Sequence, residues 1–239
     1  MILWNHTWIS DPAQYESVLN RAFRYGDGLF ETMRVYKGRL LFAKDHQARL
    51  QRGMDTLGFY LTGGQNAADL WPLLESAVEQ LKLAPHGRLR IQFFRGGAGA
   101  YTPLQDQAEW IVEGQALKND SYAAELSWTL TVSPDTPLFM GPLSGLKTCS
   151  ALPYVLAGRH ARKMGFDEAL LLCDGHVSEA SAANVFMVQQ QKIFTPPLES
   201  ACLDGVMRKQ IFALAEELKI PLVEKKLKVK DFHQADEIF

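Results

Sequence analysis

The chain is poor in cysteine, with only Cys149, Cys173 and Cys202 among 239 residues. Three cysteines cannot all pair within one chain, and no two of them have the spacing of a metal site. Structural disulfides belong mainly to oxidising compartments, so unpaired thiols favour a reducing one. We therefore predict a cytoplasmic protein without a metal centre.

Long apolar runs and a strong charge bias are also missing. No stretch approaches about eighteen consecutive apolar residues, the length that a membrane-spanning helix needs. The N-terminal segment 1–6 lacks the basic region and apolar run of a signal peptide. The net charge is −2, with 25 basic and 27 acidic residues, so no broad attraction to nucleic acid or to an anionic membrane is expected. We expect neither as a partner.

The composition is that of an ordinary globular protein, with 47% apolar and 22% charged residues. The length suits one large or two small domains. A soft stretch at 113–122 predicts a boundary, with a smaller α/β domain at 1–115 and a larger domain at 116–239. The fold class is therefore α/β or α+β. Turn signals predict a hairpin of strands at 30–36 and 39–42. Periodicity predicts helices at 45–57, 66–81, 151–164 and 207–219. It predicts further strands at 88–94, 127–133, 168–173, 185–188, 192–194 and 222–229.

Three features in the second half carry chemistry. Glu179 begins a segment of small residues, Lys147 follows a segment rich in Gly and Pro, and Gly205 precedes a predicted helix. A Schiff-base lysine, an acid facing a ring nitrogen and a helix start for a phosphate are the parts of a pyridoxal phosphate (PLP) site. Taken alone, however, each has an ordinary alternative: a surface lysine, a strand-end acid and a plain helix.

Several separated segments share one register with a known family. The chain resembles the class IV aminotransferases, the fold-type IV PLP enzymes, from about residue 24 to residue 239. The N-terminal blocks 25–31 and 46–50 also resemble that family. The most specific matches are Glu179, Ser181, Asn184, Val185, Phe186, Ile193, Thr195, Leu203, Gly205, Val206 and Arg208.

The resemblance implies a two-domain fold with PLP in the interdomain cleft, a homodimer, and an amine or amino acid substrate. Lys147 matches the lysine that binds PLP and moves protons, and Glu179 matches the acid at the pyridine nitrogen. Arg49 matches the arginine on the phosphate, although the sequence alone also allows a solvated surface charge. The remaining implied cofactor residues are Ser181, Asn184, Leu203, Val206 and Met207.

The activity is a finer question. Leu152 replaces a tyrosine usual in branched-chain aminotransferases, and Phe30 replaces one in D-amino acid aminotransferases. The loop from Arg95 to Tyr101 and the pair Ala182–Ala183 are more similar to 4-amino-4-deoxychorismate lyases. We therefore predict that lyase, which releases pyruvate and 4-aminobenzoate for folate precursor synthesis, with Phe30, Arg95 and Tyr101 as candidate substrate residues.

Two alternatives stay open. One is a class IV aminotransferase for branched-chain or D-amino acids and 2-oxo acids. The other is a degenerate member that only binds or assembles. The second arises because the family pattern continues past Phe239 into a Thr/Ser-bearing turn that also contacts the phosphate. That anchor is expected either to be missing through truncation or to come from elsewhere.

Overall fold

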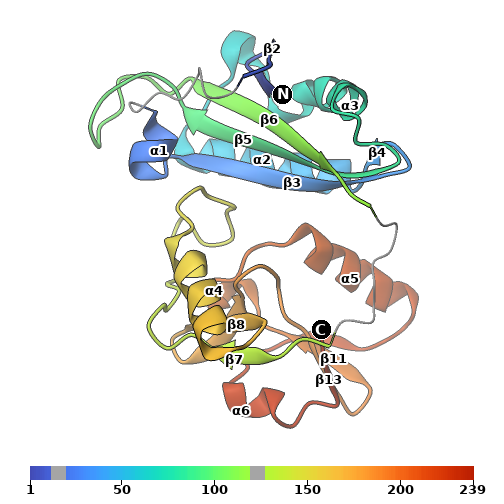
Figure 1. Ribbon diagram of the computed structural model, residues 1–239. Coiled ribbons are helices and arrows are strands. Elements are labelled where there is room, and N and C mark those ends of the chain that lie inside the picture. The colour runs from blue at the N-terminus through green and yellow to red at the C-terminus, as the bar shows by residue number, and fades with distance from the viewer. Residues whose placement is uncertain (12–19, 119–126) are drawn as a thin grey trace. The chain divides into compact units, whose positions relative to one another are not determined.

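The computed structural model describes residues 1–11, 20–118 and 127–239. It divides into two compact units. Unit 1 comprises Met1–Ala123 and Leu146–Ser150, and unit 2 comprises Ala124–Gly145 and Ala151–Phe239. Both units mix helices and strands, as Figure 1 shows. The expected α/β class is therefore confirmed. The boundary predicted after residue 115 stays a prediction, because β6 ends at Ala116 and residues 119–126 lie outside the described part of the chain.

A six-stranded sheet, in the order β2-β1-β6-β5-β3-β4, forms the frame of unit 1. Strands β3, β5 and β6 run side by side along most of their length (Figure 1). All neighbouring pairs in the sheet are antiparallel. The strands are β1 (Ile2–Trp4), β2 (Thr7–Ile9), β3 (Gly28–Tyr36), β4 (Arg39–Leu40), β5 (His86–Arg95) and β6 (Ala108–Ala116).

Helices cover the apolar face of this sheet because alternate strand residues point to one side. Leu89, Ile91 and Phe93 of β5 form one buried core with apolar residues of α2 and α3. The helices of unit 1 are α1 (Arg21–Tyr25), α2 (Ala43–Leu57), η2 (Thr62–Gly64), η3 (Ala67–Leu70) and α3 (Trp71–Gln80).

The predicted hairpin is confirmed, although β4 stops at Leu40, before the expected residue 42. The expected start of the next helix at Asp45 is wrong. Helix α2 begins at Ala43 after Phe42, and Asp45 lies inside its first turn. There its carboxylate suits the positive end of the helix dipole. Asn66 does cap the following helical segment, which opens with the 3-10 turn η3.

The segment Leu146–Ser150, which includes Lys147, groups with unit 1, whereas the residues on either side of it belong to unit 2. The reason is backbone pairing, since the Phe30 N–H donates to the Lys147 carbonyl at 2.9 Å and the Cys149 N–H donates to the Gly28 carbonyl at 2.8 Å. The lysine is therefore carried by the edge of β3.

Unit 2 contains two small sheets, β7-β8-β9 and β12-β11-β10-β13. Helix α4 packs on β8 through Ala157 and Ala161. The strands are β7 (Leu130–Val132), β8 (Glu168–Cys173), β9 (His176–Ala180), β10 (Met187–Gln189), β11 (Lys192–Thr195), β12 (Leu222–Glu224) and β13 (Glu237–Ile238). The helices are α4 (Leu152–Met164), η4 (Leu198–Ser200), α5 (Val206–Glu217) and α6 (Val229–Phe232).

Most predicted elements of unit 2 are present with shifted ends. The strand expected over 222–229 is wrong in its second half, because β12 stops at Glu224 and α6 begins at Val229. Three lysines at 225, 226 and 228 separate the two elements. Among the helices of the described ranges, none is long and apolar enough to cross a membrane.

Candidate active site

Lys147 lies against an aromatic ring of its own unit. Its Nζ is 4.6 Å from the centre of the Phe30 ring. The backbone pairing with β3 fixes the start of the lysine side chain, and Phe30 lines its far end. The face of an aromatic ring attracts an ammonium group, so Phe30 helps to hold the Nζ of Lys147 in place.

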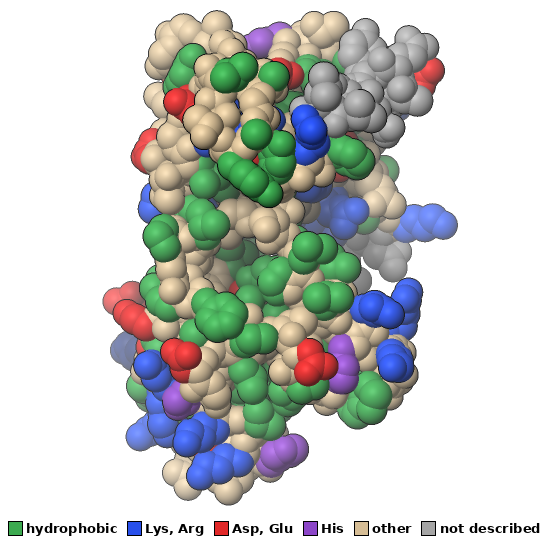
Figure 2. Space-filling view, turned by 90° about the vertical axis from the view of Figure 1, so that its left-hand side faces the viewer, with side chains coloured by type: hydrophobic (Ala, Val, Ile, Leu, Met, Phe, Trp, Pro, Cys, Tyr) green, Lys and Arg blue, Asp and Glu red, His purple; other side chains and the backbone are tan. Residues whose placement is uncertain are grey.

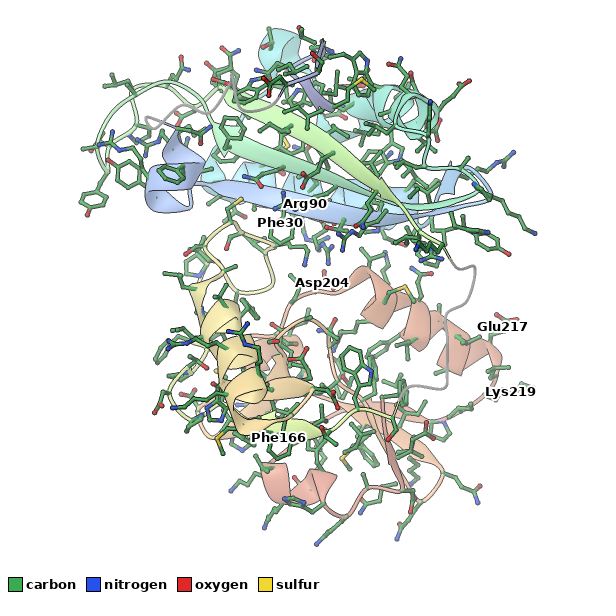
Figure 3. The ribbon with its side chains drawn as sticks, in the orientation of Figure 1. Phe30, Arg90, Phe166, Asp204, Glu217 and Lys219 are labelled. Carbon is green, nitrogen blue, oxygen red and sulfur yellow. The ribbon has the colours of Figure 1, made fainter. Side chains whose placement is uncertain are left out.

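Arg90 lies over the same Phe30 ring. Its Cζ is 4.5 Å from the Phe30 ring centre, and its Nη1 donates to Oε1 of Gln92 at 2.7 Å. Figure 3 shows Phe30 on β3 and Arg90 on β5 close together, in agreement with the pairing of the two strands. An arginine fork near a lysine amine suits a substrate carboxylate. Sequence reasoning missed Arg90, although its place on the half-buried face of strand 88–94 was a usable signal.

Arg49 is buried in an ion pair. Its Nε donates to Oε1 of Glu31 at 2.7 Å and its Nη2 to Oε2 at 2.6 Å. His46, one turn earlier on α2, lies 2.7 Å through Nδ1 from Oε2 of the same carboxylate. Arg49 is only 6% exposed, so the alternative of a solvated surface charge is wrong.

Glu31 is therefore a charged residue in the core of unit 1. Burial alone would raise the pKa of Glu31, but the hydrogen bonds and charges of Arg49 and His46 together lower it below its ordinary value. The carboxylate stays ionised and accepts only, so Nδ1 of His46 must carry the proton of their hydrogen bond. Sequence reasoning grouped Glu31 with the family blocks and gave it no role.

Glu179 is the central carboxylate of unit 2, and at 3% exposure it is no strand-end surface acid. The Tyr154 hydroxyl donates to its Oε1 at 2.8 Å, and the Leu203 N–H donates to its Oε2 at 3.0 Å. Asn184 Nδ2 donates to the Leu203 carbonyl at 2.9 Å and lies 3.4 Å from the same Oε2. The amide of Asn184 thus ties the turn before α5 to Glu179.

Tyr154 was missed by sequence reasoning. Burial, together with the charge and hydrogen bond of Glu179, raises the pKa of Tyr154. The hydroxyl therefore stays protonated and remains a donor to the carboxylate. Its signal was faint: a lone tyrosine in the first turn of α4, close after Leu152, whose side chain is 70% exposed.

Helix α5 begins at Val206, three residues after Leu203, which contacts Glu179 and Asn184. Gly205 is its N-cap and, being glycine, offers no side chain of its own to cap the first turn. A Cβ on Gly205 would overlap Oδ1 of Asn184, so only glycine allows this close approach. The first N–H groups of α5, including those of Val206 and Met207, are of the kind that binds anions at the start of a helix, and their contact with a phosphate stays a prediction. Figure 3 shows Asp204 just before this helix start.

Two other predicted site residues, Ser181 and Arg95, have structural partners. Ser181 Oγ donates to buried Glu168, which also lies 3.3 Å from the Ser181 N–H. Arg95 is buried, donating from Nε to Asp27 at 3.0 Å, from Nη2 to the Leu57 carbonyl at 2.7 Å, and from Nη1 to Asp106. These contacts favour an anchoring role for both, and their expected roles at cofactor and substrate stay predictions.

Tyr101 lies at the tip of the glycine-rich loop and is 90% exposed. Its ring is 5.6 Å from that of Tyr25. Arg21 holds the loop beneath it by donating from Nη1 to the Gly99 and Ala100 carbonyls at 3.1 and 2.7 Å. A substrate contact by Tyr101 stays a prediction.

Comparisons with known proteins give one consistent family. The model for "Amino-transferase class IV" matches residues 28–239. The D-alanine aminotransferase of Bacillus licheniformis is 28% identical over 235 residues, covering 92% of this chain and 76% of that protein. The branched-chain-amino-acid aminotransferase of Escherichia coli (strain K12) is 29% identical over 238 residues, covering 93% of this chain and 74% of that protein.

Solved structures agree. The 4-amino-4-deoxychorismate lyase from Pseudomonas aeruginosa has a TM-score of 0.84 and 26% identity, covering 100% of this chain and 86% of its own. An aminotransferase from Brucella abortus, solved with PLP, has a TM-score of 0.86 and 25% identity, covering 100% of this chain and 85% of its own.

Enzymes of this matching family depend on PLP. The residues present fit that cofactor chemically. A buried carboxylate at Glu179 suits a protonated ring nitrogen, and the start of α5 suits a phosphate. Lys147 carries a primary amine, the kind of group that binds such a cofactor. The amino acid substrates of the family likewise suit an amine-binding site with a nearby guanidinium.

Proposed function

We propose, from the premise that this chain belongs to the class IV aminotransferase family, that it is a 4-amino-4-deoxychorismate lyase. The observation that supports a substrate with a carboxylate is the pair of cations at the Phe30 ring. Lys147 Nζ lies 4.6 Å and Arg90 Cζ 4.5 Å from the ring centre. A reacting amine and a carboxylate anchor then lie on one aromatic ring.

Each candidate residue has one proposed task. Lys147 binds the cofactor and then moves a proton at the carbon that bears the substrate amine. Glu179 holds the proton on the pyridine nitrogen, supported by Tyr154 and by the Leu203 N–H. Arg49 and the N–H groups of Val206 and Met207 bind the phosphate. When bound, PLP supplies the electron sink that makes this proton acidic.

The proposed lyase step balances without a co-reactant. Lys147 takes the proton from the ring carbon that bears the amine, and the carbon–oxygen bond to the enolpyruvyl group breaks. The leaving group gains a proton and becomes pyruvate, and the aromatic product is 4-aminobenzoate. Arg90 would hold a carboxylate of the substrate during this step. The driving force is the aromatic ring of the product.

The side chains at two positions favour the lyase over transamination. Phe30 has no hydroxyl to offer a substrate, and Leu152 carries an exposed aliphatic side chain at the start of α4. The second candidate is an aminotransferase for D-alanine or branched-chain amino acids. It is supported by the 28% and 29% identity to such enzymes.

We also propose a homodimer in a reducing, cytoplasmic compartment. All three cysteines are free thiols. Unit 2 exposes large apolar side chains on and before α4, and Figure 2 shows hydrophobic side chains gathered on this face. Contiguous exposed apolar surface of this kind marks contact sites between chains. The residues are Phe139, Met140, Leu143, Leu152, Val155 and Leu156.

The deciding experiment uses the purified, PLP-loaded chain with 4-amino-4-deoxychorismate. Pyruvate is followed by its reduction with lactate dehydrogenase, and 4-aminobenzoate by its fluorescence. Equal amounts of both products are expected. Absence of pyruvate from 4-amino-4-deoxychorismate, together with formation of the matching keto acid when D-alanine or leucine is supplied with 2-oxoglutarate instead, would replace the lyase by the aminotransferase.

A further inference from the structure

We propose that Glu31 is the positioning residue of the phosphate site, holding the Arg49 guanidinium in the orientation that binds the cofactor phosphate. This inference rests on the proposed function of Arg49. It assigns a role to a carboxylate that would not itself touch an anion.

The geometry is a two-pronged pair. Arg49 Nε and Nη2 meet the two oxygens of Glu31 at 2.7 and 2.6 Å, so one edge of the planar guanidinium lies along the carboxylate. A planar fork bound along one edge has a fixed direction for its opposite edge, because the nitrogens share a plane.

The pair is itself held rigidly. Glu31 is 1% exposed, and His46 Nδ1 donates to its Oε2 at 2.7 Å. His46 and Arg49 stand one turn apart on α2 and converge on one carboxylate. The contacts of His46 and Arg49 therefore fix the Glu31 carboxylate, and the carboxylate in turn fixes the orientation of the Arg49 guanidinium.

Strand β3 links this pair to the lysine. Phe30 and Glu31 are successive residues and point to opposite faces of the sheet. Phe30 contacts Lys147, while Glu31 orients Arg49. A single strand therefore sets both the amine and the guanidinium proposed to hold one cofactor.

Two physical effects oppose each other. The negative charge of Glu31 weakens the attraction of Arg49 for a phosphate, whereas its hydrogen bonds fix the guanidinium in a binding orientation. A buried arginine without its carboxylate partner would turn toward other acceptors. We therefore infer that orientation outweighs charge, and the sign of one measurement decides between them.

The test compares PLP with pyridoxal, which lacks the phosphate, in titrations of the apoprotein. Glu31→Gln is expected to lose about tenfold in PLP affinity, while pyridoxal affinity changes by less than about twofold. Glu31→Asp keeps the charge on a shorter side chain and is expected to lose about threefold for PLP alone. It also keeps the proposal testable if Glu31→Gln fails to fold. Glu75→Gln removes an exposed carboxylate of the same unit and should change neither affinity.

The outcomes separate the two levels of the proposal. If Arg49→Ala leaves the ratio of PLP to pyridoxal affinity unchanged, Arg49 does not bind the phosphate, and both proposals fall. If Arg49→Ala collapses the ratio while Glu31→Gln preserves it or tightens PLP binding, the role of Glu31 alone is overturned. Equal losses for PLP and pyridoxal in Glu31→Gln would also overturn it, because they indicate general damage to the fold.

Discussion

The Tyr154 hydroxyl donates a 2.8 Å hydrogen bond to Oε1 of Glu179. This contact joins the first turn of α4 to the end of β9 inside unit 2. Because burial and Glu179 raise the pKa of Tyr154, the bond persists throughout the neutral range.

Removing that hydroxyl should destabilise unit 2. Tyr154→Phe leaves a buried carboxylate with one donor fewer, and we expect a loss of about 1–2 kcal/mol in the free energy of unfolding. Urea denaturation measures it. Tyr60→Phe removes a hydroxyl from an exposed tyrosine and should stay within about 0.5 kcal/mol of the parent. Equal stability of the two variants would mean that the hydroxyl does not support Glu179.

Gly205→Ala should damage the start of α5. The new Cβ would overlap Oδ1 of Asn184, so the amide must move and its Nδ2 would lose the hydrogen bond that it donates to the Leu203 carbonyl. We expect a destabilisation of about 1–3 kcal/mol and weaker PLP binding. Gly141→Ala is the matched control, because a Cβ there meets no atom within 4 Å. Unfolding and PLP titration of both variants provide the comparison, and a stable, PLP-binding Gly205→Ala would contradict the tight approach.

Lys147→Ala should abolish covalent cofactor binding. The parent is expected to show an absorbance band in the near-ultraviolet to violet that borohydride removes, and the variant should lack it. Lys147→Arg retains a cation near Phe30 but cannot form the bond, so it should lack the band as well. Lys192→Ala, at an exposed lysine of β11, should keep it. A reducible band in Lys147→Ala would assign the cofactor to another lysine.

Arg90→Gln tests the carboxylate anchor. Losing a charged hydrogen-bonding partner of the substrate should raise KM about tenfold or more, while PLP absorbance stays unchanged. Arg88→Gln lies two residues earlier on the same face of β5 but is exposed, and it should leave KM unaltered. Similar KM values for the two variants would remove Arg90 from the substrate site.

The lowered pKa of Glu31 gives a pH prediction with a definite sign. Its ionised form stabilises the folded state fully above the ordinary carboxyl value of 4.5, and this contribution is lost as pH falls through the lower folded value. The stability difference between the parent and Glu31→Gln should therefore be constant near neutral pH and shrink below about pH 4.5. Denaturation at several pH values measures it. A difference that widens on acidification would reverse the inferred direction.

Local patterns in the sequence determined the family and the candidate residues in unit 2. The family resemblance and the dependence on PLP are confirmed by the match over residues 28–239. Glu179, Asn184, Leu203 and the start of α5 lie within 30 residues of chain, where strand, turn and helix signals are short-range. Their short separation along the chain therefore predicted that they lie close together.

Only the tertiary structure decided which distant residues meet. Phe30, Arg90 and Lys147 come together because β5 pairs with β3 and because segment 146–150 returns to the edge of β3. Glu31 meets Arg49 because α2 packs its buried face on that strand. Hydrophobic periodicity predicts each strand and helix but not its partner, since pairing between distant segments depends on packing of the whole unit. That is why the contacts of Arg90, Tyr154 and Glu31 could be found only in the structure.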